Sequence, residues 1–366
     1  MTREDGSKSA GQATKHGALA RRFRQRIRSG ALKPDQALPS EPKIARDLGV
    51  SRNTIRQAMR DLEHEGLIYR VQGKGTFVRA RGSVRRTVAL VLHDIAYTTH
   101  PFTSAMIRGL GEALENGGYS LDILPCGRDE DRANLSGLAK SYDGFLLGSA
   151  SMDKQTVARL IAEELPFVFV KNYLPDLKIN AVLLDYVQAG RLAAEHLIGL
   201  GNRQIGLIYA GEATAISRDF RLGVETACTA HGLTLAPENI HDAGLSVNAI
   251  QEIIPSVHDV TGLIIMDDEL AVTAIQALAA AGKTVPRDMS VVGCNDMLIA
   301  SMSSPKLTTV RLPVTELGRQ AASRLMALIE QPSLPSDNTM LEPELVVRES
   351  TARPRKASAQ RGNRQG

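Results

Sequence analysis

The sequence predicts an α/β protein in which a small basic unit of helices and a hairpin precedes a larger body of alternating strands and helices. Near the N-terminus, an amphipathic helical pattern is followed by two short strand-like runs around a glycine-rich turn. From residue 87 onward, apolar runs alternate with helical patterns. Charge divides at the same place: residues 1–86 carry 20 Lys and Arg against 8 Asp and Glu, whereas residues 87–352 carry 19 against 32. A basic head on an acidic body is typical of a nucleic-acid-binding domain joined to a domain of another kind.

The basic unit is expected to begin with a helix at residues 16–29 and to contain two further short helices joined by a tight turn at residues 49–51. The last of these helices, from Ser51 to about residue 65, starts at a serine N-cap. Four of its apolar residues recur at the spacing of one buried face: Ile55, Ala58, Met59 and Leu62. Arginines recur every fourth residue on the outside: Arg52, Arg56 and Arg60. Such a helix suits the major groove of DNA, although a solvated basic face would follow the same pattern.

A predicted hairpin follows this helix directly. Residues 67–71 and 76–78 have the β-branched and aromatic composition of strands, and the turn between them is rich in glycine. A hairpin beside a helix-turn-helix is a wing. Gly73 and Gly75 allow the tip to approach a DNA backbone closely, and Lys74 places a positive charge there.

The segment from about His16 to Arg79 resembles the winged helix of the GntR family of bacterial transcription regulators. The resemblance is carried by ALARRFRQRIRSGALKP, LPSE, LGVSRNTIRQAMRDLEHEGL and VQGKGTFV, which occur in family order and at family spacing. It implies that contacts to double-stranded DNA come from the starts of two helices and from the wing: Ser40, Glu41, Lys43, Ser51, Arg52, Asn53, Thr54, Arg56, Gln72, Gly73, Lys74 and Gly75. After Pro-Ser-Glu the family often has Arg, whereas this chain has Pro42 and then Lys43, which can replace that Arg only as a point charge.

The body is predicted to contain two α/β subdomains. Strands are expected at residues 88–92, 121–124, 144–147, 167–170, 181–184, 205–209, 262–266 and 290–293, and helices at residues 101–116, 154–164, 188–200, 218–231, 269–281 and 314–330. Strands this apolar, separated by helices, indicate parallel sheets that are covered on both faces. Two such sets predict a cleft between the subdomains, and small ligands usually bind in such a cleft, outside the carboxyl ends of the strands.

Residues from about Thr87 to Ser350 resemble the effector domain of the LacI/GalR repressors, which has the fold of a type I periplasmic binding protein. The matching segments are AAEHLIGLGNRQIGLIYAG, GLIIMDDELAVTAIQAL, VPRDMSVVGCND, LTTVRLPVTELGRQAA and LEPELVVRES. A GntR-type head on this domain is the layout of arabinose-repressor-like (AraR-like) regulators. The combined resemblance implies a homodimer on a pseudo-palindromic operator, with the dimer contact in the effector domain and with a sugar or sugar derivative as effector.

The family's ligand contacts can be carried onto this chain one position at a time. They fall on Phe102, Thr103, Lys171, Asp185, Tyr186, Arg218, Arg221, Asp267 and Asn295. Lys171 stands where sugar-binding relatives often have Asp. The loop after Gly211 is one residue shorter than usual, which places Phe220 at the family's Arg position and leaves Arg218 and Arg221 as alternatives on either side. Asp267 and Asn295 exchange the family's Asn and Asp.

Two interpretations of this pocket remain open. Lys171 together with an Arg would favour a carboxylate or phosphate group on a sugar-like effector. Alternatively, Lys171 pairs with Asp185 or Asp267, and the effector is a neutral sugar.

The sequence contains no catalytic constellation, no metal-binding motif and no sign of a cofactor, so an enzyme is not expected. Isolated histidines such as His93 and His196 are expected to be structural. Three widely spaced cysteines, Cys126, Cys228 and Cys294, are predicted to be buried free thiols in a reducing compartment. No apolar leader and no run of about 18 apolar residues is present, so a cytoplasmic protein is predicted, with no membrane partner.

The expected domains are a disordered N-terminus at 1–14, the winged helix at 15–79, a linker at 80–86, the effector domain at 87–352 and a disordered basic tail at 353–366. The expected function is that of a ligand-responsive repressor of a sugar or sugar-derivative utilisation operon, released from its operator by the effector. A DNA-binding protein with a non-functional pocket and a corepressor-type regulator of another small metabolite are the alternatives.

Overall fold

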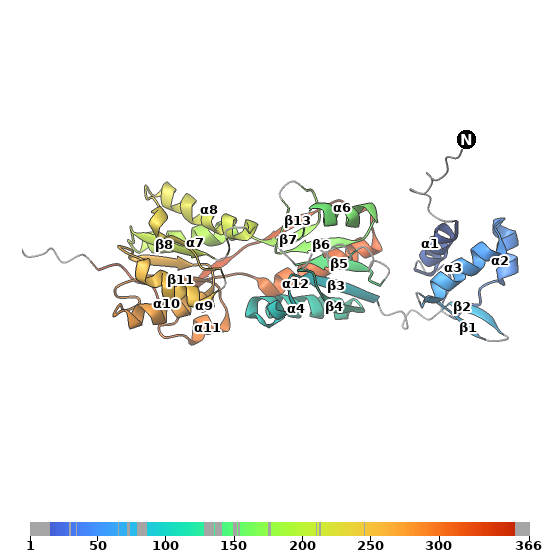
Figure 1. Cartoon of the computed structure of the whole chain (residues 1–366), viewed down its shortest axis with the longest axis horizontal. Helices are drawn as coiled ribbons and strands as arrows, with labels where there is room; N and C mark the ends of the chain where they lie inside the picture. The colour runs from blue at the N-terminus through green and yellow to red at the C-terminus, as the bar shows by residue number, and fades with distance from the viewer. Residues whose placement is uncertain are drawn as a thin grey trace, which may run out of the picture. The chain divides into compact units, whose positions relative to one another are not determined.

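The computed structural model describes residues 15–355 except 29–30, 34, 65, 72–73, 79–85, 128–134, 136–140, 149–151, 153, 175–176, 210, 212–213 and 245. The predicted disordered N-terminus, most of the predicted linker and residues 356–366 of the predicted tail therefore lie outside the described residues. The chain divides into two compact units, residues 1–86 and residues 87–366. Each unit is described by itself below, with the element labels of Figure 1.

The first unit has three helices and a two-stranded hairpin. These elements are α1 (Lys15–Arg28), α2 (Glu41–Leu48), α3 (Arg52–His64), β1 (Ile68–Val71) and β2 (Gly75–Val78). The predicted apolar face of α3 is buried in one hydrophobic cluster with residues of α1 and α2, and Ile55, Ala58 and Leu62 are fully buried. The prediction of a winged helix-turn-helix is confirmed, with element boundaries within about two residues of those expected.

Local hydrogen bonds explain where the helices of this unit begin and end. Gly49 closes α2 in the left-handed region at φ +63°, and its N–H donates to the carbonyls of Ala45 and Arg46. Glycine adopts this conformation without steric cost, which makes it a common helix terminator. The Ser51 hydroxyl then accepts a hydrogen bond from the Thr54 N–H at 3.1 Å, as predicted for the N-cap of α3.

The second unit consists of two α/β halves (Figure 1). The N-terminal half contains a six-stranded sheet in the order β13-β7-β6-β5-β3-β4. Its strands are β3 (Arg86–Leu92), β4 (Tyr119–Pro125), β5 (Gly144–Leu147), β6 (Phe167–Val170), β7 (Ala181–Leu184) and β13 (Asn338–Leu341). Its helices are η1 (Ile95–Thr99), α4 (Pro101–Asn116), α6 (Lys154–Ala162) and α12 (Val314–Glu330).

The C-terminal half contains a second six-stranded sheet, in the order β14-β12-β11-β10-β8-β9. Its strands are β8 (Ile205–Tyr209), β9 (Ile240–Asp242), β10 (Gly262–Ile265), β11 (Ser290–Asn295), β12 (Thr308–Arg311) and β14 (Glu344–Val346). Its helices are α7 (Tyr186–Gly199), α8 (Ala215–Ala230), η3 (Pro237–Asn239), α9 (Val247–Ile253), η4 (Ile254–Ser256), α10 (Asp268–Ala280) and α11 (Leu298–Met302). β14 pairs antiparallel with β12, whereas β8, β9, β10, β11 and β12 pair in parallel.

The predicted two-subdomain α/β fold is confirmed, and all eight predicted strands are present. The prediction missed four short strands, β9, β12, β13 and β14. Three of these strands, β12, β13 and β14, flank the segments that join the two halves. The chain passes between the two sheets three times: from β7 into α7, from β12 into α12, and from β13 into β14. No described helix has the length and apolar character needed to cross a membrane.

A pair of closely packed helices covers one face of each sheet, α4 with α12 in the N-terminal half and α7 with α8 in the C-terminal half. Glycines permit both contacts. A Cβ atom on Gly109 of α4 would lie 2.0 Å from the Thr315 carbonyl oxygen of α12. One on Gly190 of α7 would lie 2.0 Å from the Phe220 carbonyl oxygen of α8. In both halves, a glycine therefore allows the two helices of the pair to pack backbone against backbone.

Candidate functional site

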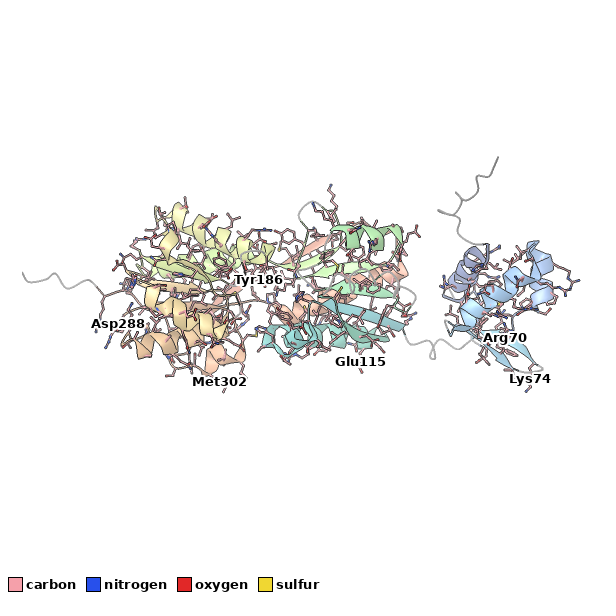
Figure 2. The ribbon with its side chains drawn as sticks, viewed as in Figure 1. Arg70, Lys74, Glu115, Tyr186, Asp288 and Met302 are labelled. Carbon is pink, nitrogen blue, oxygen red and sulfur yellow. The ribbon has the colours of Figure 1, made fainter. Side chains whose placement is uncertain are left out.

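A cavity of about 360 Å³ lies at the carboxyl ends of the strands and is lined by residues of both halves of the second unit. Tyr186 lies where the two halves meet (Figure 2). The cavity brings together six of the predicted ligand contacts: Phe102, Thr103, Lys171, Tyr186, Asp267 and Asn295. The first three come from the N-terminal half and the last two from the C-terminal half. Four helices, α4, α7, α8 and α10, begin at or beside this cavity.

Lys171 follows β6 directly and has backbone φ +73°, a conformation that a non-glycine residue rarely adopts. Its N–H donates to the Val182 carbonyl at 2.9 Å, and its ammonium nitrogen lies 4.6 Å from the centre of the Phe102 ring. Burial lowers the pKa of Lys171 to about 8, while the negative charge of Asp267 acts in the opposite direction. Among the described residues, no carboxylate forms an ion pair with this ammonium.

The Asp267 carboxylate is buried, and both of its oxygens have partners. One oxygen caps α10 by accepting from the N–H groups of Glu269 at 2.8 Å and Leu270 at 3.1 Å. The other accepts from the Asn295 side-chain amide at 3.2 Å and lies 3.9 Å from the His100 ring nitrogen. Asp267 therefore orders the wall of the cavity as well as facing it.

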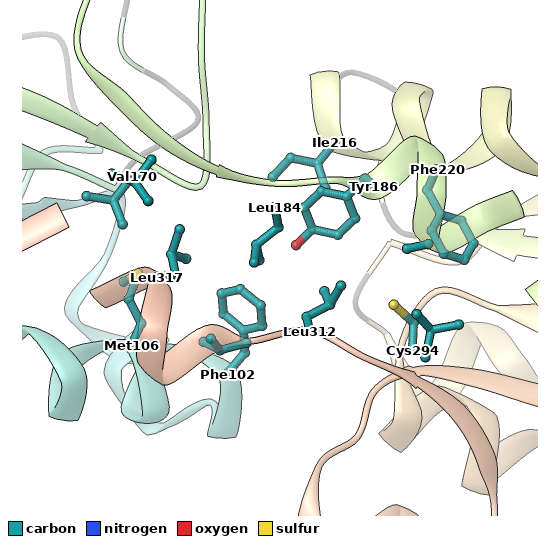
Figure 3. Close-up of a cluster of buried hydrophobic side chains, with 14 of the residues drawn as sticks. Phe102, Met106, Val170, Leu184, Tyr186, Ile216, Phe220, Cys294, Leu312 and Leu317 are labelled. Atoms are coloured by element: carbon teal, nitrogen blue, oxygen red, sulfur yellow. The ribbon is translucent and has the colours of Figure 1, made fainter. Parts of the chain in front are cut away.

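Tyr186 is the first residue of α7, and only 5% of its surface is exposed. Burial raises the pKa of its phenol well above the ordinary value, so the group remains a hydrogen-bond donor at neutral pH. The hydroxyl oxygen points toward Leu184 and Phe102 (Figure 3). In the described part of the chain, no acceptor receives a hydrogen bond from it. A bound molecule could therefore take this hydrogen bond.

The first unit exposes a separate polar surface on α3 and on the tip of the hairpin. Ser51, Arg52, Asn53 and Arg56 are exposed, and Thr54 is half-buried. Lys74 and Gly75 are exposed at the hairpin tip (Figure 2). Ser40 and Lys43 are exposed at the start of α2. Gln72 and Gly73, which were also predicted to contact DNA, lie outside the described residues.

Glu41 connects this surface to its scaffold. Its carboxylate accepts a hydrogen bond from Arg70 at 3.2 Å and lies 3.7 Å from the guanidinium of Arg56. Arg70 also pairs with Glu63 at 3.0 Å. Glu41 is thus placed to orient Arg56 on the outer face of α3.

Comparison with known proteins agrees with both units. Residues 16–78 match the bacterial regulatory proteins of the gntR family, and residues 194–351 match the periplasmic binding protein-like domain. The chain is 31% identical to the arabinose metabolism transcriptional repressor of Geobacillus stearothermophilus, over 89% of this chain and 94% of that relative. It is 27% identical to the repressor of the same name from Halalkalibacterium halodurans, over 93% of this chain and 97% of that relative.

The chain belongs to the family of bacterial transcriptional repressors that join a GntR winged helix to a periplasmic-binding-protein-like domain. The predicted resemblance is thereby confirmed, as is its implication of a ligand-responsive, DNA-binding transcription regulator. A solved complex of the transcriptional regulator CelR with cellobiose has a TM-score of 0.68 and 24% identity, over 86% of this chain and all of that chain. At this identity the likeness shows the fold alone.

Three predicted ligand contacts of this repressor do not line the cavity. Asp185 caps α7 by accepting from the Gln188 N–H at 2.8 Å. Arg218 is exposed, and Arg221 donates to Glu225 at 2.7 Å. Phe220 is fully buried in the helix that carries both arginines. That either Arg218 or Arg221 contacts the ligand therefore stays a prediction.

Sequence reasoning missed several residues that line the repressor's cavity, among them His93, Tyr97, His100, Asn172 and Ser217. His100 caps α4 by accepting from the Phe102 N–H at 3.3 Å. His93 was expected to be structural, yet it lies at the cavity, directly after β3. Its position after a strand was the available signal. His196, in contrast, lies 2.9 Å from the Thr351 hydroxyl and does not line the cavity.

The three cysteines are buried free thiols, as predicted. Within the described residues, no group of three or more His, Cys, Asp or Glu side chains could hold a metal ion.

Proposed function

We propose that this protein is a cytoplasmic repressor that binds a pseudo-palindromic operator as a homodimer and is released when a sugar or sugar derivative binds in the cavity. Helix α3 and the hairpin tip contact the DNA, and the cavity catalyses no reaction. The observation that carries the proposal is a single chain with an exposed arginine row on a recognition-type helix and a cavity lined by both halves of a two-sheet domain. The names of the relatives, repressors of arabinose metabolism, support a sugar as effector.

The contacts around Asn295 suggest how the cavity communicates with the segments that join the halves. Asn295 faces the cavity, and the next residue, Asp296, accepts hydrogen bonds from Arg311 at 2.7 Å and Arg348 at 2.6 Å. Arg311 also pairs with Glu344. Arg311 ends β12 just before the chain crosses into α12, and Glu344 begins β14 just after it crosses back.

A ligand that contacts both walls of the cavity favours one arrangement of the halves over others. Through Asp296 and Arg311, that preference acts on two of the three crossing segments. Coupling of this kind between two sites has a typical magnitude of about 1–3 kcal/mol. A ligand that lowers operator affinity by this amount is an inducer, which is the sign that we propose.

The proposal is tested by selecting DNA sites from a random pool with the full-length protein and measuring their binding by fluorescence anisotropy. Arg52→Ala should weaken binding to the selected site by about 1–3 kcal/mol if Arg52 makes a bidentate base contact. Lys74→Ala should weaken binding to all sequences and reduce the salt dependence, because a phosphate contact is lost. If both variants bind like the wild type, α3 and the hairpin do not form the DNA surface.

The effector half of the proposal is tested by a thermal-shift screen against neutral sugars, sugar acids and sugar phosphates. A ligand at 100 times its dissociation constant adds about 2.7 kcal/mol of stability. A hit that also lowers operator affinity supports an inducer, whereas a hit that raises it indicates a corepressor. Selected DNA binding without any hit would favour a DNA-binding protein with a non-functional pocket.

A further inference from the structure

The walls of the cavity differ in how far their polar groups are satisfied. Asp267 and Asn295 bond to each other, and Asp267 also caps a helix. Lys171 contributes an ammonium that contacts the face of Phe102 and forms no ion pair with a described carboxylate. Tyr186 contributes a hydroxyl that no described group accepts, and this hydroxyl also points toward Phe102 (Figure 3). Lys171 and Tyr186 therefore each offer a hydrogen-bond donor near the same ring.

An ammonium that is buried in a cavity without an ion pair is costly, because desolvation disfavours the charged form and the nearby negative charge of Asp267 offsets this cost only in part. The cation–π contact with Phe102 offsets part of this cost and keeps the side chain at the cavity. The positive backbone φ of Lys171 adds strain at the same residue. Both costs fall on a residue that makes no structural ion pair, which indicates that its charge serves a bound molecule.

The helices around the cavity add to its preference for negative charge. α4, α7, α8 and α10 all begin there, and each is at least 13 residues long. Helix N-termini carry partial positive charge and favour anions nearby. Two of these N-termini already hold a carboxylate, because Asp185 caps α7 and Asp267 caps α10, so the N-termini of α4 and α8 carry this preference. The oxygens of Asp267 are engaged by two N–H groups of α10 and by the Asn295 amide. A further lone pair of Asp267 can still accept from a ligand hydroxyl.

We propose that the effector is a polyhydroxylated anion whose negatively charged group binds the Lys171 ammonium, with the Tyr186 hydroxyl as a second donor. The hydroxyl groups of the effector then face Asp267 and Asn295 on the opposite wall. Sugar acids and sugar phosphates share this chemistry. The inference rests on the proposed function, because it names the chemical class of the effector for the same cavity.

The test uses the full-length protein and matched pairs of probes. D-glucuronate is compared with D-glucose, L-arabinonate with L-arabinose, and D-glucose 6-phosphate with both hexose probes, by thermal shift and then by isothermal titration. We expect at least one acid or phosphate to bind at least tenfold more tightly than its neutral parent. The carboxylates and the phosphate report separately, so the panel also identifies which anionic group is preferred.

Variants then assign the contact to Lys171. Lys171→Met should weaken binding of the preferred anion by about a hundredfold, because loss of one partner of a buried charge pair leaves the other uncompensated. Lys171→Arg should restore most of the affinity, and Tyr186→Phe should cost about tenfold. Lys178→Met, which removes an exposed charge from the same half, is the matched control and should change nothing.

Each remaining outcome counts against the inference. It is overturned if a neutral sugar binds as tightly as its acid, if no anion in the panel binds, or if Lys171→Met binds the anion like the wild type. Selected operator DNA is titrated in parallel, because intact DNA binding with failed anion binding rejects the inference alone. If the wild-type protein shows no specific DNA binding, the proposed function itself is rejected.

Discussion

The two halves of the effector unit share a scaffold but not the chemistry that they present to the cavity. Each half has a six-stranded sheet covered by a helix pair that packs through glycine. In the C-terminal half, the Asp267 carboxylate accepts a hydrogen bond from Asn295 and caps α10. In the N-terminal half, Lys171 has no described carboxylate partner. The glycine-mediated helix packing is repeated in both halves because the fold requires it. The charged group without an ion-pair partner, in contrast, lies at the cavity, where a ligand can supply that partner.

The outer surfaces of the halves also differ. Leu298 and Met302 are 74% and 73% exposed, the highest values among the large apolar side chains in the described residues, and both lie on α11 of the C-terminal half (Figure 2 labels Met302). If the proposed dimer uses this surface, Leu298→Ser with Met302→Ser should raise the dimer dissociation constant at least a hundredfold. Each large apolar side chain contributes about 1.5–3 kcal/mol when it is buried. Analytical ultracentrifugation measures the change.

Ile161→Ser is the matched control for the dimer prediction, because Ile161 is a 52% exposed apolar residue of the N-terminal half. It should leave the dissociation constant unchanged. An unchanged dimer in the α11 double variant would place the contact elsewhere and remove this difference between the halves.

The shared scaffold predicts equal sensitivity of the two helix pairs to a single added methyl group. Gly109→Ala and Gly190→Ala should each lower the free energy of unfolding by about 1–3 kcal/mol, because the new Cβ meets a backbone oxygen at 2.0 Å in either half. Gly111 lies two residues from Gly109 in α4, and a Cβ there meets no atom within 4 Å. Gly111→Ala should therefore stabilise by about 0.5–1 kcal/mol, since alanine favours helix over glycine.

Chemical denaturation of the four proteins measures these differences. If Gly109→Ala destabilises and Gly190→Ala does not, the two helix pairs are not equivalent, and the comparison between the halves fails at the level of packing.

The polar walls should respond to truncation in opposite ways. Asp267→Ala removes the side-chain cap of α10 and the partner of Asn295, so it should lower the free energy of unfolding by about 0.5–2 kcal/mol. Lys171→Met removes a charge that has no described ion-pair partner, and it should leave stability unchanged or raise it. Thermal unfolding without ligand compares the two. Equal losses in both variants would mean that Lys171 also has a structural partner.

The sequence predicted most of this fold because its strong signals are local. The apolar runs that form β5, β6, β7 and β8 were predicted at their observed limits. The missed strands carry weaker patterns. β12 reads TTVR, and its fully buried Thr309 donates a hydrogen bond from its hydroxyl to the buried Asp268 side chain at 2.6 Å. Such a long-range contact, between residues 41 positions apart, cannot be read from composition or periodicity.

The candidate site was predictable to the extent that its residues follow strands. Lys171 and Asn295 occupy such positions, at the carboxyl ends of β6 and β11, where an open α/β fold binds ligands. Family spacing could not show whether Arg218 or Arg221 faces the cavity, because the direction of a side chain changes within one turn of a helix. Lys171 forms no ion pair with a described carboxylate, because the two candidates, Asp185 and Asp267, cap helices instead. That assignment required the three-dimensional contacts.

A further prediction concerns pH and separates the lysine wall from the aspartate wall. In the free protein burial lowers the pKa of Lys171 to about 8. A bound anion favours the charged ammonium and raises that pKa in the complex. Anion affinity should therefore be constant below pH 8 and fall by up to tenfold per pH unit above it, until the pKa of the complex is reached. Isothermal titration of the tightest-binding anion between pH 7 and about 9.5 measures this.

Other titratable groups face the same cavity: Asp267, Tyr97, Tyr186, His93 and His100. Lys171→Arg retains all five but replaces the titrating ammonium with a guanidinium, which stays charged throughout this range. The variant should therefore lose the decline in affinity above pH 8 while still binding the anion. A decline that persists in Lys171→Arg would assign the titration to one of the other groups. A flat profile in the wild type would mean that the ammonium does not hold the anion, and the contrast between the two walls would not extend to ligand binding.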